Sequence, residues 1–379
     1  MARYAIKQCL RPMIRWGDKP ATRDGYSIVM GAPWMLRSLL EVNLRFIGQL
    51  DLTDLHEFHI VFDRTPRPGA EALMESARRA YPNIPLRFHF LEPHSGRIIE
   101  RANSGAFYHA GCCLVGLKQC QSRYAILHDF DLYPLVPNHF DRVHQAMRDH
   151  VWRFCGTDYT HFDGLKDEDA IIGTWCLGVD VHWLRQTHRP IDCFHASRRH
   201  HGRLIHMDPF SSLQWRTPER GLTPPHDVRP YSHVSNLCST ALELEKGRSP
   251  NVAWRLHYLW YLKNLDAPED AFLAMARRMR QADAPTLRVD PYEADFAGTH
   301  ASCADALRKQ LTAMDEALFG ELRRGVLAFA NAFEDFLLHF GDAAPIEREG
   351  EVVWSPQLVR AQRRTRTDEF QRQAQPTSS

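Results

Sequence analysis

The sequence predicts an α/β fold: a mostly parallel, twisted sheet with flanking helices and a helical extension at the C-terminal end. Short apolar runs alternate with amphipathic helical stretches up to residue 150. The connections between them are short, and chains with this alternation form parallel sheets with crossover helices. From Pro268 onward the pattern is helical, with apolar residues at three- and four-residue spacing.

The elements of the first part follow one another in a regular order. The first strand is expected at Tyr26–Met30, and a helix follows from Pro33, because proline is tolerated in the first turn of a helix. Gly48 ends that helix. The next elements are a strand at 58–62, a helix at 70–80, a strand at 86–91, a helix at 98–119 and a strand from Tyr124.

The pattern is less regular after the fourth strand. A helix is expected at 141–150 and strands at 151–157 and 171–179, with a polar loop between these two strands. Residues 187–235 are rich in His, Arg and Pro and show no clean periodicity. Because long irregular stretches inside compact domains are usually functional or mobile, this one is a candidate binding region.

Composition excludes several classes of protein. Lys plus Arg number 47 and Asp plus Glu 46 among 379 residues, so the formal net charge is +1. This balance gives no electrostatic basis for binding nucleic acid. No apolar run reaches the length of a membrane span, which predicts no integral membrane segment. The nine cysteines show no zinc-ligand spacing and favour a reducing, cytoplasmic compartment.

The most informative segment is Tyr124–Pro134. Four apolar residues that predict a buried strand are followed by Asp129 and Asp131. Residues two apart on an extended chain share a face. Open α/β sheets bind ligands at the carboxyl ends of their strands. Paired carboxylates at that position suit a hard divalent cation, Mn²⁺ or Mg²⁺, and such a cation suits a diphosphate.

These residues resemble those of GT-A glycosyltransferases, which have a Rossmann-like fold, and especially the β-1,4-galactosyltransferase family and its bacterial relatives. Glu100–Gly105 is similar to the family's helix start, and His128–Pro134 to its D-x-D strand end. Val61–Asp63 and Gly173–Val179 are similar to further strands of these enzymes. The chain departs from the family at Gly31–Trp34, which replaces its Pro-Phe-Arg-x-Arg motif, and it lacks the His-x-His metal motif.

The resemblance implies transfer of a sugar from a nucleotide-sugar, most simply a UDP-sugar, to a hydroxyl or other nucleophile of a glycan or small molecule. It implies that Asp131 binds the cation and that Asp129 touches the cation, its bound water or the nucleotide-sugar. Asp63 would contact the nucleoside, although an aspartate that caps a turn has the same pattern. Gly31 and Arg101 are further candidates for nucleotide-sugar binding; Arg101 has the alternative of a surface helix arginine.

A histidine and a general base would complete the site. His257 and His233 are the candidate cation ligands; His257 is favoured slightly because aromatic residues surround it, and its alternative is a core histidine. Asp208 is the leading general base, because inverting enzymes of this resemblance place a carboxylate there. The start signal Asp208-Pro209 also fits a helix N-cap.

Asp180 and Asp192 are weaker alternatives for the general base. A retaining mechanism remains open if no carboxylate reaches the acceptor. Two other functions also remain open: a sugar-phosphate nucleotidyltransferase and a non-catalytic carbohydrate-binding protein. The first would need a glycine-rich basic loop after the first strand, and the second would have no need of an intact acidic pair.

The predicted organisation has four parts. They are a lead-in at 1–24, a GT-A domain at 25–262 with a donor half (25–135) and an acceptor half (136–262), a helical region at 263–345, and a largely disordered tail at 346–379. The helical region offers a surface for a homo-oligomer.

Overall fold

The chain forms two compact units, which divide after Cys238. The computed structural model describes residues 2–18, 20–63, 66, 68–102, 104–160, 170–200, 203–234, 237–238, 240, 255–289, 292–296, 299, 304–340, 346–348 and 351–353. The predicted domain boundary at 262 falls inside helix α10 (Arg255–Lys263) of the second unit. Most of the predicted tail, residues 354–379, lies outside the described residues.

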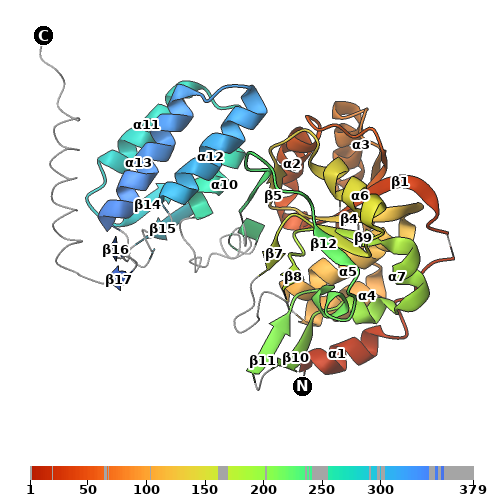
Figure 1. Cartoon of the computed structure of the whole chain (residues 1–379). Helices are drawn as coiled ribbons and strands as arrows, with labels where there is room; N and C mark the ends of the chain where they lie inside the picture. Colours follow the sequence, from red (N-terminus) through yellow and green to blue (C-terminus); the bar gives the residue numbers. More distant parts are fainter. Residues whose placement is uncertain are drawn as a thin grey trace, which may run out of the picture. The chain divides into compact units, whose positions relative to one another are not determined.

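A sheet lies at the centre of the first unit (Figure 1). It has seven strands in the order β12-β6-β9-β4-β1-β2-β3. The strands are β1 (Arg23–Ala32), β2 (Leu55–Phe62), β3 (Leu86–Phe90), β4 (Ser122–Asp129), β6 (Phe154–Gly156), β9 (Cys176–Asp180) and β12 (Arg220–Leu222). All neighbours pair in parallel except β9, which runs antiparallel to both β4 and β6. The predicted fold class, a mostly parallel sheet with flanking helices, is confirmed.

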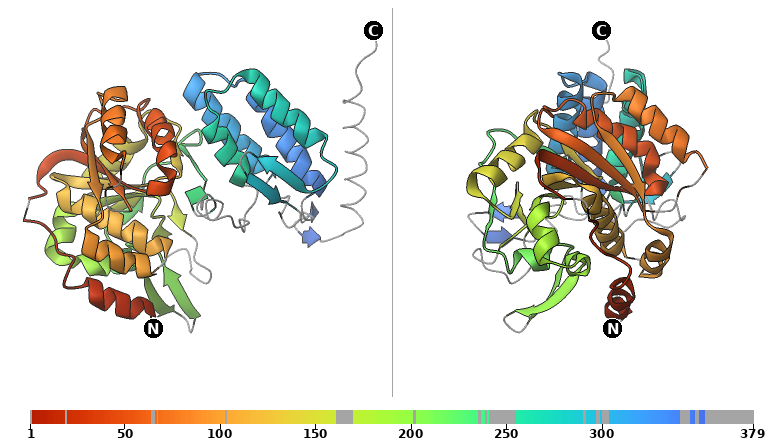
Figure 2. Two further views of the ribbon diagram at one scale, coloured as in Figure 1. Left: turned by 180° about the vertical axis from the view of Figure 1, so that it is seen from behind. Right: turned by 90° about the vertical axis from the view of Figure 1, so that its right-hand side faces the viewer.

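Helices lie against both faces of this sheet (Figures 1 and 2). Those of the first part are α1 (Ala2–Leu10), the 3₁₀ helix η1 (Trp34–Leu39), α2 (Leu40–Ile47), α3 (Ala70–Ala80), α4 (Pro93–Ala102), α5 (Gly105–Gln119), α6 (His139–His150) and α7 (Val181–Thr187). The lead-in is therefore partly helical, and α1 packs against α4.

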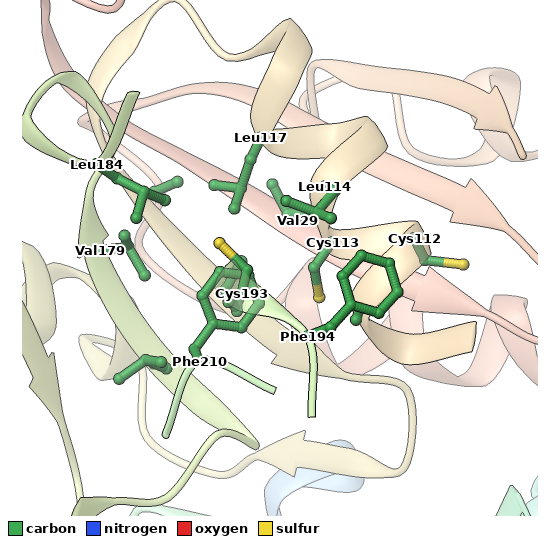
Figure 3. Packing of buried hydrophobic residues seen from close by; sticks show 14 of the residues in the cluster. Val29, Cys112, Cys113, Leu114, Leu117, Val179, Leu184, Cys193, Phe194 and Phe210 are labelled. Carbon is green, nitrogen blue, oxygen red and sulfur yellow. The ribbon is translucent and has the colours of Figure 1, made fainter. Parts of the chain in front are cut away.

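Helix α5 packs on the face of the sheet that Val29 occupies. Figure 3 shows Leu114 and Leu117 of α5 together with Val29, Phe194 and Phe210, all buried. The two phenylalanines belong to the region at 187–235 that shows no periodicity. These two aromatic residues thus anchor the region in the core. Because they are isolated in the sequence, they produce no helical or strand periodicity.

Three predicted elements differ from the observed ones. The helix expected at 98–119 is two helices, α4 and α5, because Ser104 is extended and Ser and Gly at this point favour interruption of a helix. The strand expected from Val151 begins at Phe154, since Val151 adopts a left-handed conformation (φ 53°) after α6. The strand expected at 171–179 is divided into β8 (Ile171–Ile172) and β9.

Short elements occupy residues 187–235. They are the 3₁₀ helix η3 (Pro190–Cys193), the hairpin of β10 (Ala196–His200) and β11 (Arg203–Met207), α8 (Ser211–Gln214), β12 and β13 (Tyr231–His233). Strand β13 pairs antiparallel with β5 (Leu132–Pro134), the strand directly after the acidic pair. This pairing brings the end of the region at 187–235 next to the acidic pair at the carboxyl end of β4.

The second unit is helical with short hairpins, which confirms the predicted C-terminal extension. Beside α10 it contains α11 (Glu269–Arg280), α12 (Ala304–Phe319), α13 (Arg324–Phe340) and the strands β14 (Thr286–Val289), β15 (Tyr292–Asp295), β16 (Ile346–Arg348) and β17 (Glu351–Val353). Its core is aromatic, with Trp260 and Phe272 packed on Phe329. In the described residues of both units, no helix combines the length and apolar character of a membrane span.

Candidate active site

The acidic pair lies at the carboxyl end of β4, as predicted. Asp129 is the last residue of the strand, and its N–H donates to the carbonyl of Trp175 at 2.9 Å. The side chain of Asn43 on α2 donates to the carbonyls of Phe130 (3.1 Å) and Leu132 (3.4 Å). Asn43 therefore helps to hold the turn between the two aspartates from the neighbouring helix.

His233 joins the two aspartates. Its Nε2 lies 3.8 Å from Asp129 Oδ2 and 3.6 Å from Asp131 Oδ1. One ligand atom from each of the three residues lies within 4.8 Å of the others, and among the described residues this is the one group of His, Cys, Asp or Glu with that property. Two carboxylates and an imidazole form a donor set that suits Mn²⁺ or Mg²⁺.

The electrostatics of the group favour a bound cation. Burial raises the pKa of Asp129, and the negative charges of Asp131 and Asp208 raise it further. The nearby imidazoles of His109 and His233 act in the opposite direction. Two carboxylates held this close repel each other, and a divalent cation between them removes that repulsion.

A second histidine touches the pair from α5. His109 Nδ1 lies 3.2 Å from Asp129 Oδ1, so this oxygen faces the helix while Oδ2 faces His233. The sequence interpretation missed His109. A signal for it was present in the sequence: His109 is a polar residue in the N-terminal half of an otherwise apolar helix. A helix that follows a parallel strand begins at the carboxyl edge of the sheet, so this half of the helix is near the acidic pair.

Gly31 and Asp63 lie at the same sheet edge. Gly31 is the register partner of Asp129 across β1 and β4. Asp63 follows β2, and its Oδ1 accepts a hydrogen bond from the Trp34 N–H at 2.8 Å. One oxygen of Asp63 thus stabilises the start of η1, which is the turn-capping role, while the residue remains beside the site. Arg101 is exposed in the last turn of α4, and among the described residues the ion-pair partners of Asp129 and Asp131 are histidines, not Arg101.

Asp208 directly follows β11 and is exposed. Helix α8 begins only at Ser211, with Phe210 in a left-handed conformation before it and no side-chain cap. The side chain of Asp208 therefore does not cap the helix. Its charge contributes to the raised pKa of Asp129, which places the two carboxylates within electrostatic range.

His257 has the environment of a core residue. It lies on α10 in the second unit, fully buried between the rings of Phe329 and Phe333, with ring centroids 4.8 and 4.3 Å away. Burial lowers its pKa to about 3. The preference for His257 over His233 as the cation ligand is thus corrected: the aromatic neighbours that favoured it fill the interior of a helical unit.

The two weaker candidates for the base also have structural roles. Asp180 is buried and accepts hydrogen bonds from Arg153 (2.6 Å) and from the Trp183 N–H (3.0 Å). Its register partner Tyr124 lies at the start of β4, so it occupies the opposite sheet edge. Asp192 on η3 accepts a hydrogen bond from the N–H of Arg189, the residue before that helix, and forms an ion pair with the Arg189 side chain.

The fold and this group of side chains define the class: an α/β protein with a candidate divalent-cation site at the carboxyl edge of a mostly parallel sheet. No family model matches the chain, and no curated protein matches it. The resemblance to β-1,4-galactosyltransferases therefore stays a prediction.

Solved structures of glycosyltransferases are similar over much of the chain. Residues 1–349 of TarS from S. aureus match at 11% identity, with 88% of this chain and 97% of that chain covered and a TM-score of 0.37. The mannosyltransferase PcManGT from Pyrobaculum calidifontis, in complex with GDP-Man and Mn²⁺, matches at 12% identity, with 97% and 90% covered and a TM-score of 0.40. Similarity of this degree assigns no activity to the chain.

Proposed function

We propose that this chain is a metal-dependent glycosyltransferase that uses a nucleotide-sugar. The observation that carries the proposal is the convergence of Asp129, Asp131 and His233 at the end of β4. This is the sheet edge at which open α/β proteins bind ligands. Two carboxylates and an imidazole can bind the divalent cation that a diphosphate needs. The site thus combines a ligand-binding position in the fold with a set of cation ligands.

The side chains at this sheet edge divide into cation ligands and nucleotide-sugar contacts in this proposal. Asp131, Asp129 through Oδ2 and His233 through Nε2 would hold the cation, which supplies Lewis-acid neutralisation of the departing diphosphate. Asp63 and Gly31, at the ends of the adjacent strands, would contact the nucleoside of a UDP-sugar. Arg101 remains a candidate for a phosphate or sugar contact.

Asp208 is the proposed general base. In an inverting reaction, an acceptor hydroxyl oxygen forms the new bond to the anomeric carbon, the bond from that carbon to the diphosphate oxygen breaks, and the hydroxyl proton passes to a carboxylate. Asp208 supports this role because its side chain has no capping or pairing function in the described part of the chain. Its position directly after β11 fixes its backbone next to the core residue Met207.

A stability measurement tests the proposal. The melting temperature of the full chain is measured with UDP, with Mn²⁺ and with both, and the series is repeated with GDP. A ligand that binds only the folded state raises the free energy of unfolding, by about 2.7 kcal/mol at one hundred times its Kd. We expect the rise in melting temperature with nucleotide and cation together to exceed the sum of the two separate rises, because a cation held by the site would attract the charged diphosphate.

A second measurement identifies the substrate. Individual nucleotide-sugars are incubated with the protein and Mn²⁺, and release of the nucleoside diphosphate is followed, with chelator as the control. Chelator-sensitive hydrolysis of one nucleotide-sugar supports a glycosyltransferase and names its sugar. Indifference to every nucleotide and nucleotide-sugar in the presence of Mn²⁺ contradicts the proposal and favours a non-catalytic protein.

A further inference from the structure

A line of three side chains extends from His233 away from the acidic pair. The indole of Trp175 stacks on the His233 ring, with centroids 5.4 Å apart and planes 29° apart. Trp175 Nε1 donates to the hydroxyl oxygen of Tyr231 at 3.3 Å. The Tyr231 hydroxyl in turn donates to the carboxylate of Asp158. The imidazole of a candidate cation ligand is thus connected through a stack and two hydrogen bonds to a residue just after β6.

The position of Trp175 is strongly constrained. Its carbonyl accepts the N–H of Asp129, so its backbone is fixed to the acidic strand end. Its ring also lies against the backbone of Gly173: a Cβ at that glycine would be 2.3 Å from the ring, which no side chain allows. With Gly173 and His233 both against it, the indole has little freedom to rotate.

Tyr231 and Asp158 hold the edge of the indole. Tyr231 is two residues before His233 on β13, so both side chains lie on the same face of that strand. The Tyr231 hydroxyl donates to Asp158, because an ionised carboxylate offers only acceptor atoms. Because Tyr231 donates to Asp158, its oxygen lone pairs are available to accept the indole N–H.

We propose that Trp175 is a positioning residue, held by Tyr231 and Asp158, that fixes the ring plane of His233 so that Nε2 faces both aspartates. The inference rests on the proposed function, because it assigns these side chains to the cation site. A histidine whose ring is already oriented loses less side-chain entropy when it binds a cation. Groups that orient a metal-binding histidine typically contribute about 10- to 100-fold to metal affinity.

The test is direct measurement of Mn²⁺ binding to the full chain, with and without UDP, from the paramagnetic resonance signal of free Mn²⁺. Trp175→Ala removes the stack, and we expect its Kd for Mn²⁺ to rise about tenfold. Tyr231→Phe removes only the hydroxyl, so we expect a smaller rise. Trp175→Phe keeps an aromatic ring on His233 and is expected to lie closer to the wild type than Trp175→Ala.

Tyr261→Phe is the matched control. The Tyr261 hydroxyl also donates to a carboxylate, Asp315, at 3.1 Å, but within the helical unit. We expect its removal to leave the Kd for Mn²⁺ unchanged, whatever it does to stability. Transfer assays add a second readout: a positioning defect raises the Mn²⁺ concentration needed for half-maximal rate while saturating Mn²⁺ restores most of that rate.

Three outcomes decide the matter. Weaker Mn²⁺ binding by Trp175→Ala and Tyr231→Phe, with Tyr261→Phe unchanged, supports the positioning role. Wild-type affinity in folded Trp175→Ala and Tyr231→Phe overturns it and leaves the proposed function standing. If the wild-type chain binds neither Mn²⁺ nor a nucleoside diphosphate, the proposed function itself is wrong, and the positioning role is overturned with it.

Discussion

Gly31 on β1 and Asp129 on β4 are direct neighbours in the parallel register of the sheet. Helix α5 covers both: Cys112 lies over Gly31, and His109 contacts the carboxylate of Asp129. A Cβ at Gly31 would lie 3.0 Å from the Cys112 Cβ, closer than side chains normally pack. Because positions three apart share a helix face, the absence of a side chain at Gly31 lets α5 come close enough for His109 to reach Asp129.

Replacement of Gly31 is therefore expected to act on the fold and on the cation site together. Gly31→Val places a branched side chain against Cys112 and should lower the free energy of unfolding by about 1–3 kcal/mol, the usual cost of overpacking. We also expect weaker Mn²⁺ binding, because displacement of α5 moves His109 from Asp129. Urea unfolding and Mn²⁺ titration measure the two effects.

Gly105→Ala is the control for this variant. It lies at the start of the same helix, and a Cβ there would meet nothing within 4 Å. Alanine is the better helix former, so stability should be unchanged or slightly higher. If Gly31→Val matched Gly105→Ala in both stability and Mn²⁺ affinity, the close approach of α5 would have no importance for the site.

Asp131→Ala is expected to abolish transfer while the fold stays intact. Loss of a direct ligand removes most of the charge stabilisation that a cation supplies, which is worth several kcal/mol and corresponds to about 10²-fold or more in rate. Turnover and circular dichroism are measured in parallel. Asp149→Ala on the exposed surface of α6 serves as the control, and transfer at the wild-type rate by purified Asp131→Ala would show that the cation assignment is wrong.

Asp208→Asn should reduce kcat by about 10²- to 10⁴-fold, the usual contribution of a general base. Its Kd for the nucleotide-sugar should change little, because the base contacts the acceptor rather than the nucleotide. Asp192→Asn is the comparison, because it alters a carboxylate of η3 that is engaged with Arg189, the residue before that helix. Equal turnover in the two variants would remove Asp208 as the base.

The buried His257 predicts acid sensitivity of the helical unit. Its pKa is about 3 in the folded chain, and a histidine has a pKa near 6.5 when unfolded. Below pH 6.5 the unfolded state therefore takes up a proton that the folded state does not. The contribution of His257 to the free energy of unfolding is therefore highest above pH 6.5 and falls by up to about 1.4 kcal/mol per pH unit as the pH drops toward 3.

Urea unfolding at pH 7 and pH 5 measures this dependence. In His257→Leu, the decrease in the free energy of unfolding between pH 7 and pH 5 should be smaller than in the wild type. In His339→Gln, which removes an exposed histidine of α13, the decrease should be as large as in the wild type. His139 in the first unit has the same lowered pKa, so some acid sensitivity remains in every variant. An identical pH response in His257→Leu and the wild type would mean that His257 does not stay neutral in the folded chain.

Local sequence patterns predicted most of the sheet and the acidic strand end. The alternation of apolar runs with helical periods placed β1 to β4 correctly, because buried parallel strands leave a clear apolar signature. The break between α4 and α5 was missed, since the apolar face continues on both sides of Ser104. The short strands β8 and β13 contain too few residues to show a period.

The α/β class, the helical C-terminal part and the paired carboxylates could be predicted, because each depends on spacing within one segment. The histidine that joins the pair could not be predicted in this way, because its position depends on tertiary contacts. His233 and His257 both lie near aromatic residues in the sequence, but antiparallel pairing of β13 with β5 carries His233 to Asp131, and packing between two phenylalanines buries His257. That choice depends on pairing between segments far apart in the chain, where no local pattern records the partner.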